Sequence, residues 1–589
     1  MASSRNEGDP QGQRSLNEPL TPSTRYDLYS LPTELLFAIL ELLDDESICK
    51  IGQTSQTFNH LSCSVFLFRN QMQDVLAEGR LNIQWTSSKA TLTVLRNAFF
   101  LANLNEIHYD FVPGPQRLLR QTLDLDALVQ RQRGVHRVEI DFSDIDSFCV
   151  GRAPEYVDRQ CGEAWIPAFM DLMRHIAGHE CKVVVVANGE ELGRYLNEFA
   201  KLEEYVYDHD PQGGLEAYPI VRKGKKKKRS LRSLGSWIQA RLHPRKPRTL
   251  QSAAESTTNT DTAIPQPRHL RDLEDQPEDD FKPRSSIPGL ESITLGSSLM
   301  LYDGFYHFTA DLLQASAQSL FELNIDCQSD LVPLSGWKSF FTSLELPRLS
   351  HISITSSFLL ETPLIRPEFV TYFLARHPSL TVVRINGPLD PRLSSFFLPK
   401  AAILPKLAVA AAHPLYISWL MNLRNKLPNL KEVMLLSQDH QALSVPHHMM
   451  DDALRCVAEH MDVHHKSPHS PAIPLTLGIR FTTYGNLDAW FRSHLLRNTQ
   501  TQCGASVLER LVSIKTVRIS SFFLYRFEED RFWLLLRFLS FFPQVEALEL
   551  VDQMSHLDGE PDGGELKKKV KAVCPGIGRV VVNGDALRG

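Results

Sequence analysis

Near the amino terminus, the apolar positions predict a short helix that is hydrophobic around most of its circumference. At about 100° per residue, the apolar side chains from Leu35 to Leu43 cover an arc of about 220°, and Glu34, Ala38 and Glu41 occupy the remaining strip. That arc is about twice as wide as the stripe that a surface helix buries against its own domain. One part of the arc can pack internally, and the rest requires a second surface.

Two further helices are predicted directly after the first. Ser30 can cap the first helix, with Pro32 in its first turn, and the pair Asp44 and Asp45 ends it. A second helix is predicted over 46–52, and Thr54 or Ser55 can cap a third. The third helix carries apolar side chains at helical spacing, namely Phe58, Leu61, Val65 and Phe66. Three short helices in about 40 residues are too small a body to bury all of this surface.

This arrangement resembles the F-box motif over residues 28–70. The matching positions are Leu31-Pro32, Glu34-Leu35, Ile39-Leu40, Leu43, Ile48, Ile51 and Phe58, although Gln56, Thr57 and Phe58 stand where the family usually has Trp or Arg. The resemblance implies docking on the Skp-type adaptor of a cullin–RING ubiquitin ligase. It implies an adaptor-binding platform made of Leu31, Pro32, Leu35, Leu36, Ile39, Leu40, Leu43, Ile48, Ile51 and Phe58. An ordinary buried helical hairpin is the alternative.

A second pattern, apolar-x-x-apolar-x-apolar, recurs along the rest of the chain. Many successive copies begin about 29 to 32 residues apart, with longer gaps that include those of about 46 and 50 residues. The copies begin at Leu104, Val135, Cys181, Leu290, Leu320, Leu349, Leu380, Leu430, Ile514, Val545 and Ile577. Amphipathic helices are predicted between them, at 337–344, 367–376, 416–427, 449–461 and 530–541. Each unit therefore predicts one coil of a β/α solenoid with parallel strands.

The repeats resemble leucine-rich repeats across 92–206 and 287–587, but in degenerate form. The Asn that follows the strand in that family is replaced by Ser297, Gln328, Ser356 and Ser437 or their neighbours. We therefore expect an α/β protein in which a three-helix F-box is followed by an irregular solenoid. A doubly wound βαβ sheet is the structural alternative, although no Gly-rich phosphate loop follows a strand to support it.

In a solenoid, the residue between the paired apolar positions points outward on the concave face. These outward positions are mixed in charge and in type, which suits the recognition of another protein. The candidate substrate-binding residues are Glu322, Asn324, His351, Arg384, Glu432 and Arg518. For each of them, a solvated strand position is the alternative.

The composition limits the partners and the compartment. The chain has 589 residues and a formal net charge of −6, whereas dedicated nucleic-acid binding requires a basic face, so we expect no specific nucleic-acid partner. Nine cysteines without a CxxC pair indicate free thiols in a reducing compartment. Residues 1–25 are polar and predict a disordered arm without a secretory signal. The most hydrophobic later run, 532–542, contains Arg537 and is too short to span a membrane. The chain is therefore expected in the cytoplasm, the nucleus or both.

Residues 207–286 interrupt the repeats with a low-complexity, charged insertion that predicts disorder. Its first part is basic, with a dense run of Lys and Arg over 222–248, and its second part is acidic. The basic run is consistent with a nuclear import signal. A solvated linker without a receptor is the alternative.

Catalytic motifs are not found in the sequence. It contains no GxSxG, HExxH, Walker-type loop or GxGxxG pattern. A His-rich stretch includes His460 and His464, which would share a helix face, but no nearby Cys or Glu completes a ligand set. We therefore expect no catalytic residues, no metal site and no cofactor.

The sequence favours a non-catalytic, substrate-recognition subunit of a ubiquitin ligase, which would hold an unidentified target protein near a separately recruited conjugating enzyme. Two other hypotheses stay open. The chain could bind the adaptor outside any ligase, or it could be a nuclear scaffold that uses its basic insertion.

Overall fold

A computed structural model describes most of the chain outside the amino-terminal arm and the charged insertion. The described residues are 31–84, 91–98, 104–113, 115–132, 134–149, 159–193, 289–326, 334–355, 365, 367–386, 404–422, 427–436, 447–465, 474–481, 485–499, 506–521, 529–551 and 563–587. The predicted arm at 1–25 and the predicted insertion at 207–286, with its basic run at 222–248, lie outside these residues.

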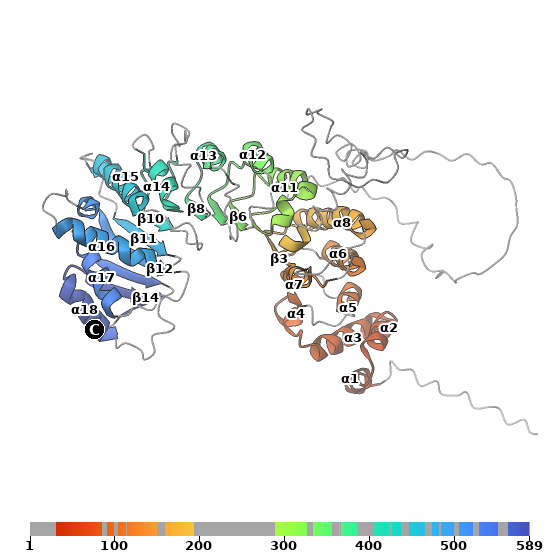
Figure 1. Ribbon diagram of the computed structural model, residues 1–589. Helices are drawn as coiled ribbons and strands as arrows, with labels where there is room; N and C mark the ends of the chain where they lie inside the picture. Colours follow the sequence, from red (N-terminus) through yellow and green to blue (C-terminus); the bar gives the residue numbers. More distant parts are fainter. Residues whose placement is uncertain are drawn as a thin grey trace, which may run out of the picture. The chain divides into compact units, whose positions relative to one another are not determined.

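One sheet runs through the described part of the chain (Figure 1). Its fifteen strands lie side by side in the order in which they occur in the sequence, and neighbouring strands from β1 to β14 are parallel. The strands are β1 (Arg80–Ile83), β2 (Glu106–Asp110), β3 (Arg137–Asp141), β4 (Val183–Ala187), β5 (Ser292–Gly296), β6 (Glu322–Asp326), β7 (His351–Thr355), β8 (Val382–Asn386), β9 (Val409–Ala412), β10 (Glu432–Leu436), β11 (Leu475–Phe481), β12 (Ile514–Ser521), β13 (Ala547–Val551), β14 (Arg579–Val582) and β15 (Asp585–Ala586).

Helices connect the strands and cover one face of the sheet (Figure 1). They are α4 (Asp74–Ala77), α5 (Thr91–Asn97), α6 (Pro115–Arg131), α7 (Ser143–Cys149), α8 (Arg159–Gly178), η3 (Ser298–Leu301), α11 (Asp303–Ala315), α12 (Leu334–Ser343), α13 (Pro367–Arg376), α14 (Pro414–Leu420), α15 (His447–His465), α16 (Gly485–Thr499), η6 (Val507–Arg510), α17 (Glu529–Leu539) and α18 (Gly563–Val573). Three more helices precede α4 and the first strand: α1 (Thr33–Glu41), α2 (Asp45–Gly52) and α3 (Gln56–Arg69).

Alternating burial along most of the strands explains the recurring apolar pattern. In β6, for example, Leu323 and Ile325 are completely or almost completely buried, whereas Glu322 and Asn324 lie on the opposite, partly exposed face. Each such fully buried aliphatic side chain contributes about 1.5–3 kcal/mol relative to an exposed one. The predicted β/α solenoid with parallel strands is confirmed. The doubly wound alternative is wrong, because the strand order never reverses.

The apolar pattern in the sequence did not predict three of the parallel strands. β1 lies before the first predicted repeat, β9 lies within the gap of about 50 residues, and β11 lies between the repeats at Leu430 and Ile514. β9 was missed because alanines, Ala410 and Ala412, occupy the buried positions that larger residues fill elsewhere.

The helix boundaries also differ from prediction. α13 has the predicted bounds, but α14 begins earlier and ends at Leu420 instead of 427. It begins earlier because the His413 side chain accepts a hydrogen bond from the Leu415 N–H (3.3 Å) and Pro414 occupies the first turn. α15 continues to His465, past the predicted end at 461. Within the described helices, none combines the length and the hydropathy that crossing a membrane would require.

The sheet ends in a tight hairpin after β14. Asn583 and Gly584 both have positive φ angles, 49° and 93°, as the two central residues of a type I′ turn require. The turn brings β15 back antiparallel to β14, with Val582 opposite Asp585.

Candidate functional site

Helices α1, α2 and α3 form a small body with its own apolar core. The Asp44 carboxylate caps α2 by accepting a hydrogen bond from the Ser47 N–H (2.7 Å). Hydrogen bonding with Ser47 lowers the pKa of Asp44. Ser55, not Thr54, caps α3 and accepts from the Phe58 N–H (3.2 Å). α2 begins at Asp45, one residue earlier than predicted. The predicted cap Ser30 lies outside the described residues, and Pro32 stands at the cap of α1 without a side-chain hydrogen bond.

Arg69, at the end of α3, holds the turn between α1 and α2. Its guanidinium donates hydrogen bonds to the backbone carbonyls of Glu41 (2.7 Å) and Leu43 (2.8 Å) and to the Asp45 carboxylate (3.1 Å). Those carbonyls belong to the end of α1 and the residues after it, which have no helical partner of their own. The orientation of α1 is therefore fixed by hydrogen bonds as well as by apolar packing.

A second set of contacts joins this body to the start of the solenoid. Val94 and Ala98, in and after α5, belong to the same apolar core as the three helices. The buried Asn59 side chain donates to the Gly52 carbonyl (2.9 Å) and to the Asn97 carbonyl (2.6 Å). The three-helix body is thus continuous with the first helix of the repeat region.

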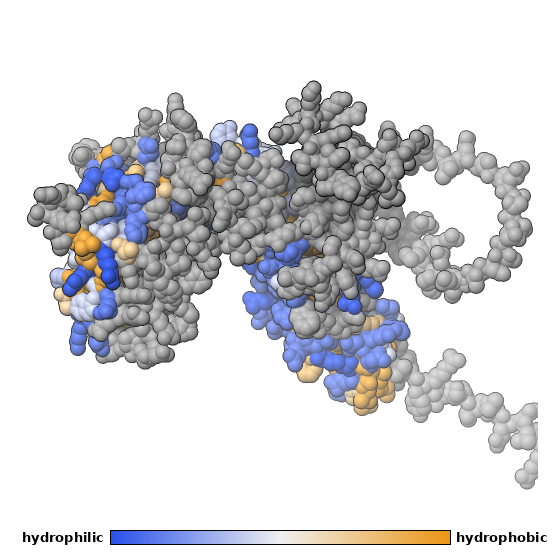
Figure 2. All heavy atoms as spheres, in the orientation of Figure 1, coloured by the Kyte–Doolittle hydropathy of each residue, from blue (hydrophilic) through white to orange (hydrophobic). Residues whose placement is uncertain are grey.

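The outer face of α1 exposes three large apolar side chains. Leu42 is 87% exposed, Leu35 52% and Ile39 42%. We call these three residues the α1 patch. Figure 2 shows a hydrophobic area at the place that α1 occupies in Figure 1. On the helical wheel they fall together within about 60° of arc, which is the part of the apolar arc that internal packing leaves free.

The structure divides the ten predicted platform residues into two groups. Leu35 and Ile39 are exposed apolar side chains, Pro32 is exposed, and Leu31, Leu43 and Ile51 are partly buried. The other four pack inside the three-helix core and offer no side-chain surface to a partner: Leu36, Leu40, Ile48 and Phe58. These four therefore pack the core of the platform, and the exposed residues are the ones left to meet a partner.

Two exposed apolar residues were missing from the predicted platform. Leu42 lies on the predicted apolar arc, and its position at the end of α1 makes it the most exposed of the three patch residues. Phe68, near the end of α3, is also exposed. No pattern in the sequence marks Phe68 as exposed, since its neighbours Phe66 and Leu67 are fully buried.

The candidate substrate-binding residues lie on the sheet face opposite the helices, in separate groups. Glu322 and Asn324 are joined by a hydrogen bond (3.1 Å), and His351 is the neighbour of Glu322 on the next strand. The His351 ring lies 2.7 Å from the Ser350 hydroxyl and edge-on to Phe321. Arg384 on β8 is exposed.

Arg518 and Glu432 form the second group, although β11 lies between their strands. The Arg518 guanidinium reaches Glu432 (2.5 Å) and also donates to Glu549 on β13 (2.8 Å). Gly478 on β11 lies between Met434 and Arg518 in the register, and a Cβ there would approach the Met434 side chain to 3.0 Å. The glycine therefore leaves room for the side chains that cross this strand.

A buried Asp–His–Ser chain is the one catalytic-looking arrangement that we find in the described residues. The Asp451 carboxylate accepts from Trp490 Nε1 (2.9 Å) and lies 3.0 Å from His494 Nε2, and His494 Nδ1 lies 3.0 Å from the Ser506 hydroxyl. All four side chains are almost completely buried. A nucleophile must be reachable by its substrate, so this network serves to join α15, α16 and η6.

Part of the His-rich stretch, including His440 and His469, lies outside the described residues. Within the described ranges, no three His, Cys, Asp or Glu side chains are arranged to hold a metal ion. α15 does reach His464, as a shared helix face with His460 requires, but His460 is buried.

Comparisons with known proteins agree with the geometry of the amino-terminal helices. No curated protein matches the chain. A crystal structure of a protein from Bacteroides fragilis matches at 12% sequence identity with a TM-score of 0.26, over 51% of this chain and 68% of that chain. At that TM-score the likeness adds nothing to the fold described above. A family model described as F-box-like matches residues 28–74, which contain α1, α2 and α3. Residues 28–74 of this chain are therefore an F-box-like domain.

Proposed function

We propose that the chain is the substrate-recognition subunit of a Skp–cullin–F-box type ubiquitin ligase. The F-box-like domain implies a role in protein–protein interaction, and F-box proteins are generally non-catalytic adaptors. In this proposal, the α1 patch docks on the Skp-type adaptor. The open face of the sheet holds a target protein, so that a separately recruited conjugating enzyme acts by proximity.

The observation that carries the proposal is the α1 patch within the F-box-like match. Large apolar side chains that remain exposed together on one helix are typical of an interaction site. Here the exposed side chains are not a consequence of poor packing, since Leu36 and Leu40 on the same helix are buried. Arg69 and the α2 cap hold the helix in place before any partner binds. A preorganised surface loses little entropy on binding.

The polar face of the sheet supports the second half of the proposal. The strands present alternating charged, polar and aliphatic side chains in register, as at Glu322, His351 and Val382 on β6, β7 and β8. Such a surface offers many separate contacts across a long sheet, as the recognition of a folded protein requires.

Co-expression with a Skp-type adaptor, a cullin and a RING subunit tests the proposal. We expect the full chain to co-purify with all three at equal stoichiometry. If the adaptor binds and the cullin is excluded, the chain acts outside a ligase and the proposal is wrong. If the adaptor does not bind, the docking assignment itself is wrong.

A further inference from the structure

A pocket lies where the end of the F-box-like domain meets the first strands of the sheet. Its volume is about 260 Å³, enough for one large side chain. The wall on the domain side comes from α4 and from the residues between α3 and α4, and the wall on the sheet side comes from β1, β2 and β3. The lining residues that matter below are Met72, Asp74, Val75, Arg80, Glu106 and Glu139.

Carboxylates outnumber guanidinium groups around this pocket. The lining contains three carboxylates, Asp74, Glu106 and Glu139, against two arginines, Arg80 and Arg137. Two further carboxylates contact lining residues from its margin, because Glu78 pairs with Arg80 and Asp110 lies beside His108. Five carboxylates thus surround the pocket against two guanidinium groups and one imidazole, so the pocket carries a net negative charge.

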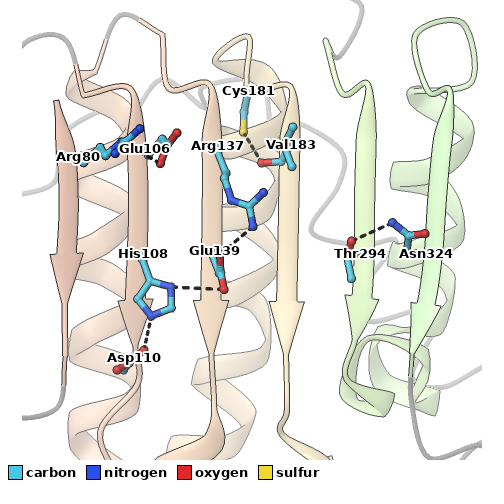
Figure 3. A network of polar contacts seen from close by, with 10 residues as sticks. All are labelled: Arg80, Glu106, His108, Asp110, Arg137, Glu139, Cys181, Val183, Thr294 and Asn324. Carbon is cyan, nitrogen blue, oxygen red and sulfur yellow. Dashed lines mark hydrogen bonds and ion pairs between the residues drawn. The ribbon is translucent and has the colours of Figure 1, made fainter. Parts of the chain in front are cut away.

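The two arginines are already engaged by carboxylates (Figure 3). Arg137 Nη2 donates to Glu139 at 2.9 Å along the same strand. Arg80 Nη1 lies 2.8 Å from Glu78, and its Nε lies 3.5 Å from Glu106. Neither guanidinium stands alone as an anion-binding group, so the positive charge in the pocket is locally compensated.

Two of the carboxylates are much less engaged than the others. For Glu106, the ion pair that the structure shows is the long 3.5 Å contact with Arg80, and the side chain remains about one third exposed. Asp74 stands in the first turn of α4 with its carboxylate exposed. Glu139, by comparison, is contacted by both Arg137 and His108. Glu106 and Asp74 are therefore the acceptors that remain available to a ligand.

We propose that this pocket binds a lysine or arginine side chain of a protein that the chain recruits. The ammonium or guanidinium group would take Glu106 and Asp74 as acceptors, and the aliphatic stem would lie along the wall that Met72 and Val75 form. The proposal rests on the proposed function only in that the ligand belongs to a recruited protein. The pocket is built from residues other than the α1 patch, so the two can fail separately.

An anionic ligand, such as a phosphorylated side chain, fits this pocket poorly. It would approach Glu106, Glu139 and Asp74, and it would have to break the existing pairs of Arg80 and Arg137 to gain donors. Breaking such a pair leaves a carboxylate without its partner, which costs binding energy. The charge of the site thus distinguishes the two ligand classes.

The test uses fluorescein-labelled Gly/Ser peptides with a central Lys-Arg-Lys or a central Glu-Asp-Glu, and the full chain. Fluorescence anisotropy at low ionic strength, where charge contacts are least screened, measures the dissociation constant. We expect the basic peptide to bind and the acidic peptide not to bind. Glu106→Gln and Asp74→Asn, each nearly isosteric, should each weaken the basic peptide by about tenfold, the loss expected for a charge-assisted hydrogen bond.

The control is Glu546→Gln, which removes an exposed carboxylate far along the sheet, directly before β13, where it pairs with Lys515. It should leave the affinity unchanged. Thermal melts check that each variant is folded, and the two single variants act on different elements, α4 and β2. Equal affinity of the basic peptide for the native chain and for both pocket variants would overturn the proposal. Preferential binding of the acidic peptide would also overturn it, and would assign the binding role to the arginines.

Discussion

Replacing the α1 patch by Leu35→Gln, Ile39→Gln and Leu42→Gln tests the docking surface directly. Each substitution keeps a side chain of roughly similar size and replaces its apolar end by an amide. The three side chains together expose about as much surface as two fully exposed leucines. Burial of one such side chain is worth about 1.5–3 kcal/mol, so complete burial against an adaptor would contribute about 3–6 kcal/mol. Even half of this value predicts an affinity loss of at least about tenfold.

The measurement is the dissociation constant for the purified Skp-type adaptor, by isothermal titration calorimetry. The matched control carries Leu123→Gln and Leu496→Gln, which replace leucines that are exposed to a similar degree on α6 and α16. The control should bind like the native chain, and both variants should melt within a few degrees of it, because the replaced side chains lie at the surface. Native-like affinity of the triple variant would refute the assignment of α1 as the docking helix.

Three further predictions concern stability. Leu40→Ala, in the core beside the patch, should destabilise the F-box-like domain by about 2–5 kcal/mol, seen as faster hydrogen exchange in α1 to α3 with little change in the repeats. Burial, with a hydrogen bond to the Asp146 carboxyl group, raises the pKa of Glu190 to about 8. Between about pH 4.5 and pH 8 the Glu190 carboxyl group is therefore protonated in the native state but ionised in the unfolded chain, so a rise in pH favours unfolding. The melting temperature of the native chain should therefore fall between pH 5 and pH 8.5, and Glu190→Gln should reduce that fall. A variant whose melting temperature depends on pH as that of the native chain does would contradict this prediction. Asp451→Ala leaves Trp490 and His494 without their shared acceptor. It should lower the free energy of unfolding, measured by urea titration, by about 3 kcal/mol. A loss below about 1 kcal/mol would show that the network contributes little to stability.

The sequence predicted those parts of the fold that burial controls. The alternation of apolar positions located β6, β7 and their counterparts because a parallel strand in a solenoid must bury every second side chain. The same logic failed at β9, where alanines fill the core, since a small side chain carries a weak hydrophobic signal. The pattern at α1 also predicted that part of its apolar arc needs a partner, and the structure leaves that part exposed.

The candidate sites depended on contacts that no local pattern contains. Arg69 closes the turn after α1 from 24 to 28 residues away, and Arg518 reaches Glu432 across an intervening strand. The pocket at β1 was not predicted because β1 itself was not predicted. In addition, the walls of the pocket come from segments that meet only in the folded chain. Long-range side-chain contacts of this kind follow from the register, which sequence spacing alone does not specify.

The hairpin at Asn583 and Gly584 has a consequence for how copies of this protein meet in solution. A stack of parallel strands ends in a row of free amide and carbonyl groups, which can template a further strand from another molecule. By folding back on β14, the two residues of β15 occupy part of that row and reverse the strand direction there. A second molecule that added its own strand in the parallel sense would first have to displace them. The short return strand thus discourages end-to-end polymerisation and keeps the remaining surfaces available for partners of a different kind.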